Sequence, residues 1–470
     1  MYTIVDKKLQ QALDATWEPI NYMAVPKMEA KDYLERIQNI WKMKEAEEYS
    51  CLIIYGDREH FSNVHYFTDL DVRFEETLLV LYRDRKPVII LGNEDMAYSD
   101  IIPYDIDRRL YQSFSLMGQP NDARSPLLSD LFKSLELPQT GKIGLIGWKK
   151  YSAKLHPSCR LVTDVPYYIV EELLKQVEES RLQNATDLLT DCVYGLKHHI
   201  SAKEIAQFEV LGTKASRNVY NCLRSLKPGV TEIDSSLALC IDGDPLATHP
   251  NVNFGDKNTS YGLSGPKYYK KLEVGDFIGV GYGLRGSNVH KSGIYAGSMA
   301  DIPDGRKGYI EEMAKPYFAT IVRWYEMMRI GTRCEDVWQM VEDWIGFEKF
   351  GIGLNPGHLS HTDEWTHSPF EKESKVRLAS GMALQCDFTV SFNSPYMTCH
   401  VEDGLVIADA ALRDEVKHIA PESWARIEQR QHFMKNTLNI DLGDEVLPMS
   451  DMPAVCFPYM ADLTTIFAKA

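Results

Sequence analysis

The stretch Val274-Gly275-Asp276-Phe277-Ile278-Gly279-Val280-Gly281-Tyr282-Gly283 decides how the rest of this sequence is interpreted. Side chains of a strand point alternately to opposite faces, so Phe277, Gly279, Gly281 and Gly283 share one face of the strand that this pattern predicts. Glycine within a strand often marks the close approach of a ligand or of another backbone segment, although it also fills space beside a bulky neighbour. The pattern therefore predicts a glycine-lined strand, with a binding site as one explanation of the glycines.

Histidines and carboxylates recur in several blocks further along the chain. A second strand is predicted from His290 to Tyr295, shortly after the first. The later blocks contain Gly-His, His-Ser-Pro, Gly-Met-x-x-x-x-Asp and Val-Glu-Asp motifs, at 357–358, 367–369, 381–387 and 401–403.

In order and spacing, these blocks resemble the family that contains methionine aminopeptidase, prolidase, aminopeptidase P and creatinase. Two upstream segments strengthen the resemblance, namely a helix start at 197–204 and a Lys-Pro-Gly-Val-Thr-Glu turn at 227–232. The resemblance implies an α/β amino-terminal domain over residues 1–180 and an α+β pita-bread domain over 181–470. In the pita-bread arrangement, a curved antiparallel sheet is flanked by two pairs of helices. Residues from about 425 would form an extension beyond the last strand of the family.

Composition narrows the classes of function. The chain has 470 residues, which predicts two domains, and 44% of them are hydrophobic, as in ordinary globular proteins. A formal net charge of −16 argues against nucleic acid as a partner, since the phosphate backbone needs a basic face. Nine cysteines without a Cys-x-x-Cys pair fit a reducing cytosol. No apolar run suits a membrane span or a signal peptide, so we expect a cytoplasmic protein with no membrane partner.

The amino-terminal third shows alternating helical and strand patterns. Residues 33–46 have apolar side chains at helical spacing, and four short apolar runs predict strands. A polar helix over 169–185 is predicted to join the two domains. The four runs lie at 51–55, 78–82, 87–91 and 142–147, with a hairpin turn at 83–86.

The resemblance also implies where metal ligands would lie. Family members hold two divalent ions with two aspartates, one histidine and two glutamates, and these positions correspond here to Gly281, His290, His358, Asp387 and Glu402. Glycine offers no donor atom, so we expect no dinuclear centre. The leading interpretation is a cluster without metal that works by acid–base chemistry, as in creatinase. The alternative is a single zinc, iron or manganese ion held by His290, His358, Asp387 and Glu402.

Further candidates come from strand alternation and from a histidine-rich loop. His400 and Glu402 share one face of their strand. The segment 358–367 contains three histidines and two carboxylates, and histidine titrates near neutral pH, which suits a proton shuttle. We assign catalytic roles to His358, Glu402, His367 and Asp387, and substrate-binding roles to His290, His361, His400 and Arg73. In creatinase-like dimers the corresponding region of the neighbouring subunit enters the pocket, and the sequence leaves open whether Asn63, His65 or Arg73 does so here.

The family histidine that grips the substrate has no direct counterpart. The expected offset after the turn at 255–258 holds Leu263 and Ser264, and only His249, upstream of the turn, is a candidate to replace it.

Three hypotheses about function remain open. The first is a creatinase-like hydrolase or lyase that breaks a C–N or related bond in a small guanidino, amide or amino-acid-like substrate by His/carboxylate acid–base catalysis. The second is a catalytically disarmed aminopeptidase fold with a binding or regulatory role, which the glycine at 281 favours. The third is a hydrolase or lyase of the same fold with a mononuclear metal site. The resemblance also implies a homodimer, and fold alone does not decide among the three.

Overall fold

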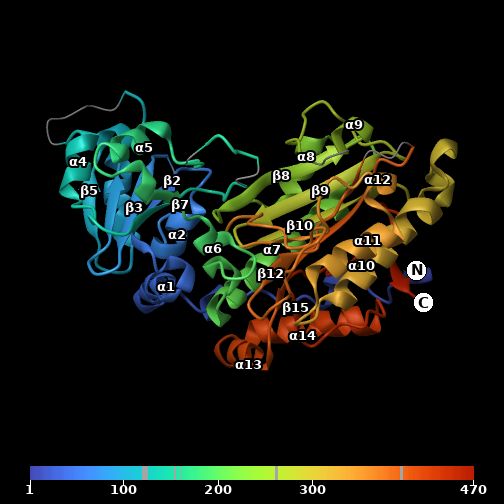
Figure 1. Ribbon diagram of the computed structural model, residues 1–470. Coiled ribbons are helices and arrows are strands. Elements are labelled where there is room, and N and C mark those ends of the chain that lie inside the picture. The colour runs from blue at the N-terminus through green and yellow to red at the C-terminus, as the bar shows by residue number, and fades with distance from the viewer. Residues whose placement is uncertain (73, 119–124, 153–154, 160, 260–262, 392–394) are drawn as a thin grey trace. The chain divides into compact units, whose positions relative to one another are not determined.

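The computed structural model of the chain describes residues 1–72, 74–118, 125–152, 155–159, 161–259, 263–391 and 395–470. It divides into two compact units, one formed by Lys27–Lys197 and the other by Met1–Pro26 together with His198–Ala470 (Figure 1). Within the described residues, no helix is long and apolar enough to cross a membrane.

The first 26 residues belong to the unit that contains the carboxyl terminus, not to the amino-terminal domain predicted over residues 1–180. The reason is a strand pairing between the two ends of the chain. Strand β1 (Ile4–Lys8) pairs antiparallel with β16 (Thr465–Lys469), and the two termini lie side by side in Figure 1.

The unit of residues 27–197 is a six-stranded sheet with helices on both faces. The strand order is β5-β4-β3-β2-β6-β7; β3 runs antiparallel to both β2 and β4, and the other neighbours are parallel. These strands and the β3–β4 hairpin confirm the strands predicted in this region. The elements are α1 (Ala30–Lys42), β2 (Tyr49–Gly56), α2 (Ser62–Thr68), β3 (Thr77–Tyr82), β4 (Val88–Leu91), α3 (Asn93–Tyr98), β5 (Asp107–Leu110), α4 (Leu128–Ser134), β6 (Lys142–Ile146), α5 (Tyr167–Leu174), β7 (Leu182–Asn184) and α6 (Asp187–Thr190).

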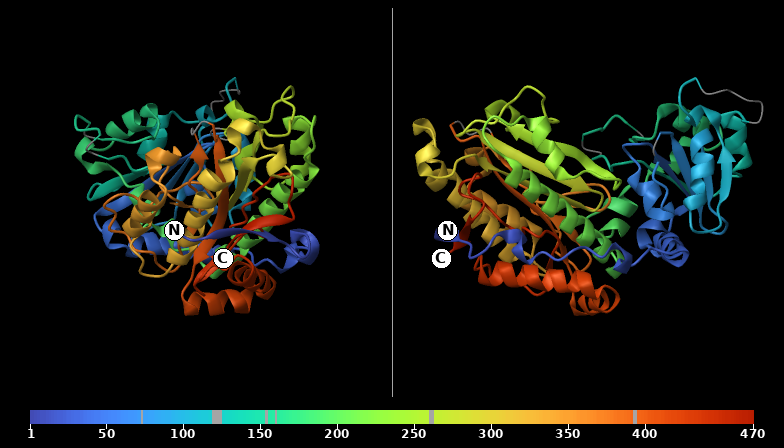
Figure 2. Two further views of the ribbon diagram at one scale, coloured as in Figure 1. Left: turned by 90° about the vertical axis from the view of Figure 1, so that its right-hand side faces the viewer. Right: turned by 180° about the vertical axis from the view of Figure 1, so that it is seen from behind.

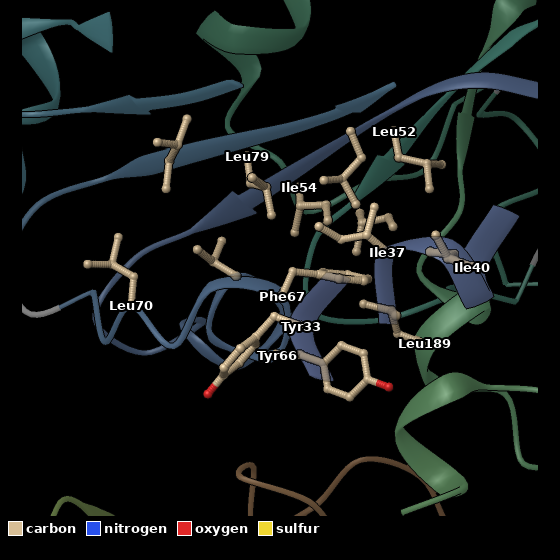
Figure 3. Packing of buried hydrophobic residues seen from close by; sticks show 14 of the residues in the cluster. Tyr33, Ile37, Ile40, Leu52, Ile54, Tyr66, Phe67, Leu70, Leu79 and Leu189 are labelled. Carbon is tan, nitrogen blue, oxygen red and sulfur yellow. The ribbon is translucent and has the colours of Figure 1, made fainter. Parts of the chain in front are cut away.

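Strand alternation gives this sheet two separate apolar cores. On one face, Leu52 and Ile54 of β2 pack with Ile37 of α1 and Phe67 of α2, and Figure 3 shows Leu79 of β3 in the same cluster. On the other face, the intervening residues of the same strands pack against α4 and α5. Burial on both faces explains why these strands appear in the sequence as continuous apolar runs.

The single joining helix predicted over 169–185 is wrong. Helix α5 ends at Leu174, and the strand β7 at Leu182–Asn184 pairs in parallel with β6. Val177 and Leu182 lie in the apolar core of this unit. The segment is therefore held by strand pairing and packing, which override its helical pattern.

The second unit is built on an eight-stranded sheet of antiparallel pairs. Its main path is β11-β12-β14-β10-β9-β8, and β13 and β15 also pair with β14. Besides β1 and β16, its elements are α7 (Ala202–Ser225), α8 (Glu232–Ser236), β8 (Leu246–Phe254), α9 (Asp256–Thr259), β9 (Phe277–Leu284), β10 (Ser287–Ile294), α10 (Lys315–Met327), α11 (Cys334–Trp344), α12 (Phe347–Phe350), β11 (His358–Leu359), β12 (Ala383–Gln385), β13 (Val390–Ser391), β14 (Thr398–Ile407), α13 (Ala410–Ile419), α14 (Pro421–Asn436) and β15 (Val446–Pro448).

Helices cover one face of this sheet. Figures 1 and 2 show α7, α10 and α14 on the same side of β8, β9 and β10. Phe208 of α7 lies against the backbone of Gly286, and the hydroxyl of Tyr317 of α10 accepts a hydrogen bond from the backbone N–H of Val401. Because side chains alternate along a strand, His290 and Glu402 point to the opposite face of the sheet.

The carboxyl-terminal segment also belongs to the helix-covered side. Strand β15 pairs with β14, and the buried ion pair between Lys291 and Asp403 is joined to this segment by a hydrogen bond from Lys291 to the carbonyl oxygen of Met452. Phe457 is buried as well. The carboxyl-terminal extension therefore packs within its own unit.

Candidate active site

Two rows of side chains cross the face of the sheet that lies opposite the helices. The first row, in register from β8 to β14, contains Asn251, Gly281, His290 and Glu402. The second row, also in register, contains Asn253, Gly279, Ser292 and His400. Cross-strand neighbours in register point to the same face, so the four strands bring these side chains together.

The glycines of β9 make room for the imidazole of His290. A Cβ added at Gly281 would lie 2.4 Å from Cδ2 of His290, and one added at Gly279 would lie 3.2 Å from its Cε1. The ring therefore lies against the backbone of β9. A side chain at position 281 and the observed position of the His290 ring exclude each other, so a bulky neighbour accounts for these two glycines.

His290, His400 and Asp387 form a hydrogen-bonded chain. Nδ1 of His290 lies 2.9 Å from Nδ1 of His400, and Nε2 of His400 lies 2.9 Å from Oδ1 of Asp387. An ionised carboxylate only accepts, so Nε2 of His400 donates to Asp387. Nε2 of His290 is buried and has no hydrogen-bond partner among the described residues.

Burial and the neighbouring groups shift two pKa values in this chain. Burial, followed by the neighbouring His400, lowers the pKa of His290 well below its ordinary value, which keeps the ring neutral. Burial raises the pKa of Asp387, but the hydrogen bond from His400 and the nearby imidazoles outweigh burial, and the pKa lies below its ordinary value.

His358 opens β11 and is fully buried. Its ring stacks on Trp365, with the ring centroids 4.1 Å apart. Nδ1 lies 3.2 Å from the carbonyl oxygen of Leu359, so the neutral ring carries its proton there. Nε2 lies 3.1 Å from Oε1 of Glu364 and 3.6 Å from Oδ2 of Asp387. Burial lowers the pKa of His358, but the Glu364 carboxylate outweighs burial and the pKa is raised.

Glu402 completes a cluster of four donors, which we call the carboxylate–imidazole cluster. One donor atom from each of His358, Glu364, Asp387 and Glu402 lies within 4.8 Å of every other. Oε1 of Glu402 accepts a hydrogen bond of 2.8 Å from Nδ2 of Asn288. Burial, with further contributions from Asp387 and Glu364, raises the pKa of Glu402 well above its ordinary value. Three carboxylates this close together need a proton or a metal cation between them.

The donor types of this cluster fit one divalent ion. One imidazole nitrogen and three carboxylate oxygens suit zinc, iron or manganese. A second ion in the manner of the family would need a carboxylate at position 281, where the ring of His290 lies instead. The donor set also differs from the one predicted for a single ion, because Glu364 belongs to the group of four and His290 does not.

Two histidines of the segment 358–367 make their described contacts outside the cluster. Nε2 of His361 lies 3.0 Å from Oε1 of Glu204 at the start of α7, and its ring is edge-on to Phe208. His367 is exposed, and its Nδ1 lies 3.1 Å from the carbonyl oxygen of Ser368. The substrate-binding role assigned to His361 and the catalytic role assigned to His367 remain predictions, without a described contact to the cluster.

Two other sequence candidates lie elsewhere. Arg73 is outside the described residues. His249 is exposed on β8, the edge strand of the main path, and its Nε2 lies 2.7 Å from the carbonyl oxygen of Leu263. The imidazole therefore reaches the backbone of the residue at which the family's gripping histidine was expected.

Three contributors to the site were missed from the sequence, namely Glu364, Trp365 and Asn288. Asn288 carried a usable signal, because it precedes His290 by two residues and strand alternation places both on one face. Glu364 and Trp365 stood in a segment already singled out for its histidines. That segment folds back so that the backbone N–H of Leu359 donates to the carbonyl oxygen of His367. Only this fold shows that Glu364 and Trp365 lie against His358.

Comparison with known proteins identifies the fold. No protein-family model and no curated protein sequence matches the chain. Among solved structures, an Xaa-Pro dipeptidase from Bacillus anthracis matches with a TM-score of 0.60 at 13% identity, over 81% of this chain and 96% of that one. A recombinant prolidase from Thermococcus sibiricus matches with a TM-score of 0.61 at 13% identity, over 82% of this chain and 96% of that one. A putative aminopeptidase P from Bacillus anthracis matches with a TM-score of 0.55 at 12% identity, over 84% of this chain and 99% of that one. The chain thus has their fold, an α/β amino-terminal domain followed by a pita-bread domain, as expected.

Proposed function

We propose that this chain, which has the fold of prolidase and aminopeptidase P, is a hydrolase of a C–N bond in a small polar substrate. Amide, guanidino and amino-acid-like compounds are the candidate substrates. The reaction would take place at the carboxylate–imidazole cluster, with one divalent metal ion bound rather than two.

The contact between His358 and Glu364 carries the proposal. Nε2 of the buried His358 lies 3.1 Å from Oε1 of Glu364, whose side chain is 21% exposed, and 3.6 Å from Oδ2 of Asp387. Unless the imidazole is protonated, all three atoms are electron-pair donors and need a cation between them. Burying several carboxylates without a compensating charge is costly, and such clusters are typical of catalytic or metal sites.

His358, Glu364, Asp387 and Glu402 would hold the ion. When bound, the ion would polarise the group under attack and offset the negative charge that develops in the transition state. Without the ion, burial and the carboxylates of Asp387 and Glu364 raise the pKa of Glu402, so this group holds a proton closer to neutral pH than an ordinary glutamate does. Binding of the ion would release that proton, because a carboxylate ligand is deprotonated.

The surrounding residues would orient these groups. Asp387 fixes the ring of His400 through its Oδ1, and His400 in turn fixes the ring of His290. Trp365 stacks on one face of His358 and excludes water from that face. A site held by neighbouring strands of one sheet is rigid, which favours catalysis by positioned groups.

Ordinary Xaa-Pro peptidase activity, which the names of the structural neighbours describe, is not part of the proposal. Gly281 removes one family ligand, and Leu263 and Ser264 stand where the gripping histidine is expected. We therefore expect negligible release of an amino-terminal residue before proline, even with added manganese or cobalt.

Acid–base catalysis without a metal ion is the second candidate. The pKa values of Glu402 and His358 are both raised, so each group can keep a proton in the cluster in place of an ion. The two candidates use the same residues and differ only in what neutralises the carboxylates.

Metal analysis of protein purified without added metal, combined with a screen of amide and guanidino compounds, tests the proposal. We expect one equivalent of metal, which Glu364→Gln should release, whereas Glu371→Gln, at an exposed glutamate of the following loop, should retain it. His358→Ala and Glu402→Gln should each lower turnover by ~100- to 10,000-fold, as the loss of a general acid or base does.

Each outcome of these experiments separates the single-ion hydrolase from one alternative. Two equivalents of metal that survive dialysis would refute the single-ion site. Turnover by metal-free protein would select the second candidate. Ligand binding with no turnover anywhere in the screen would refute the hydrolase and indicate a disarmed scaffold that only binds.

A further inference from the structure

Three asparagine side chains, Asn251, Asn253 and Asn288, lie on the face of the sheet that carries the carboxylate–imidazole cluster. We call them the amide cluster. Asn251 and Asn253 belong to β8 and Asn288 belongs to β10, so they flank β9 from both sides. Their partners across β9 are, in that order, Gly281, Gly279 and Gly283.

Each of these side chains presents an unused acceptor. The side-chain oxygens of all three are buried and have no hydrogen-bond partner among the described residues. Nδ2 of Asn253 donates to the carbonyl oxygen of Ser264 at 2.8 Å, and Nδ2 of Asn288 donates to Glu402 at 2.8 Å, so the orientation of both amides is fixed by their donors. Asn253 is fully buried and Asn288 is 9% exposed. A buried acceptor without a partner is unfavourable, and such atoms are rare in folded proteins.

These acceptors gather over the glycines of β9. Oδ1 of Asn288 and Oγ1 of Thr248 both lie 2.8 Å from the position of a Cβ at residue 283. A Cβ added at residue 281 would lie 3.4 Å from the Cβ of Asn251 and would also touch the ring of His290. Nε2 of His290 is a further buried atom on this face without a hydrogen-bond partner among the described residues.

The charge on this face is negative. Glu402 stands in the first row, and Asp387 is bonded to His400 of the second row. Lys291 points to the other face, where it pairs with Asp403. Among the described residues of the two rows there is no lysine or arginine. Acceptors combined with negative charge select a ligand that is cationic and carries N–H donors.

We propose that the amide cluster is the substrate subsite for a cationic nitrogen group, an alkylammonium or a guanidinium. The inference deepens the proposed function and rests on it for the bond that is broken. The substrate would be an amide or guanidino compound whose cationic end contacts the amide cluster while its reacting bond lies at the carboxylate–imidazole cluster.

Access to the amide cluster involves the segment Leu263–Ser264. The amide oxygens are shielded from solvent, and three hydrogen bonds join this segment to β8 beside them. His249 donates through Nε2 to the carbonyl oxygen of Leu263 at 2.7 Å, and Asn253 donates to the carbonyl oxygen of Ser264 at 2.8 Å and to its hydroxyl at 3.2 Å. Opening these three bonds would separate the segment from β8.

Ligand titrations on the full chain test the subsite. The probes are n-butylguanidinium and its neutral near-isostere N-butylurea, with dissociation constants measured by ligand-observed NMR. We expect butylguanidinium to bind at least about tenfold more tightly, since hydrogen bonds to charged groups are roughly twice as strong as neutral ones. Asn251→Asp should strengthen its binding about fivefold and Asn251→Leu should weaken it about fivefold. Asn436→Asp, an exposed site on α14, is the matched control and should have no effect.

The opposite signs of the two Asn251 variants separate a subsite from a folding defect, which would weaken binding in both. Equal affinity for the charged and neutral probes, or a shift of both variants in the same direction, would overturn the proposal. If Asn251→Leu does not fold, the comparison of Asn251→Asp with Asn436→Asp decides alone. Charge-selective binding without hydrolysis of any amide would refute the proposed function and leave the subsite standing. Hydrolysis of charged and neutral substrates at equal rates would refute the subsite and leave the proposed function standing.

Discussion

Replacing Gly281 with alanine tests the steric pairing between this position and His290. The added methyl group would lie 2.4 Å from Cδ2 of His290, well inside van der Waals contact, and 3.4 Å from the Cβ of Asn251, an ordinary contact. The ring of His290 is held by its hydrogen bond to His400, so it cannot tilt away without breaking that bond. Overpacking of this kind typically destabilises a protein by about 1–3 kcal/mol.

The same substitution should behave differently once His290 has been replaced with alanine. The clash is then gone, and the strand conformation at position 281 accepts a side chain because its φ is not positive. Alanine is favoured over glycine within a strand by about 0.5–1 kcal/mol. In this background Gly281→Ala should therefore be neutral or stabilising, which gives the double-mutant cycle a coupling free energy of about 2 kcal/mol.

The assay must report on this unit alone, because a chain of two units need not unfold in a single step. Hydrogen exchange of peptides from β9 and β10, followed by mass spectrometry over a urea series, gives the local free energy of unfolding. Gly243→Ala is the control, since an added Cβ there meets nothing within 4 Å. If Gly281→Ala lowers the local free energy of unfolding by the same amount with and without the His290 ring, the steric pairing is refuted.

Three further predictions follow from other contacts. The pKa of Glu402 is raised, so in metal-free protein this group keeps a proton that the unfolded chain releases. The free energy of unfolding should therefore fall as the pH rises above the ordinary glutamate pKa. Urea titrations at several pH values measure this slope, and Glu402→Gln should remove it. His361→Ala should destabilise by about 1–3 kcal/mol, because it removes one hydrogen-bond partner of the buried carboxylate of Glu204. Metal content should stay unchanged, and loss of the metal would place His361 in the site after all. Light scattering at micromolar concentration should give the mass of a homodimer, and a monomer would contradict the expectation from the resemblance.

Much of the fold could be predicted from local patterns in the sequence. The strands near 51–55 and 142–147 appear as apolar runs because both faces of their sheet are covered. The segment at 169–185 was misjudged because its apolar residues also fit a helix, and pairing of β7 with β6 lies outside what local spacing reports. The pairing of β1 with β16 joins residues from opposite ends of the chain, so local spacing does not report it either.

The candidate site was predicted in part. Strand alternation placed His400 beside Glu402, and the resemblance placed His358 and Asp387 near them; all four lie together. Glu364 was missed as a member, since its contact with His358 depends on how an irregular segment folds back. Loops are fixed by many weak contacts rather than by a repeating pattern, so the direction of a loop side chain is poorly encoded locally.

The sequence by itself determined the identities of the donors and one exclusion, since glycine at 281 has no ligand atom whatever the fold. The tertiary structure decided the rest. Cross-strand register brought His290 against the glycines of β9, which explains why residue 281 carries no side chain. Packing across the sheet turned His361 toward α7 and brought Glu364 toward His358. The physical reason is that a residue's chemistry is fixed by its type, whereas its partners are set by register and packing between segments far apart in the chain.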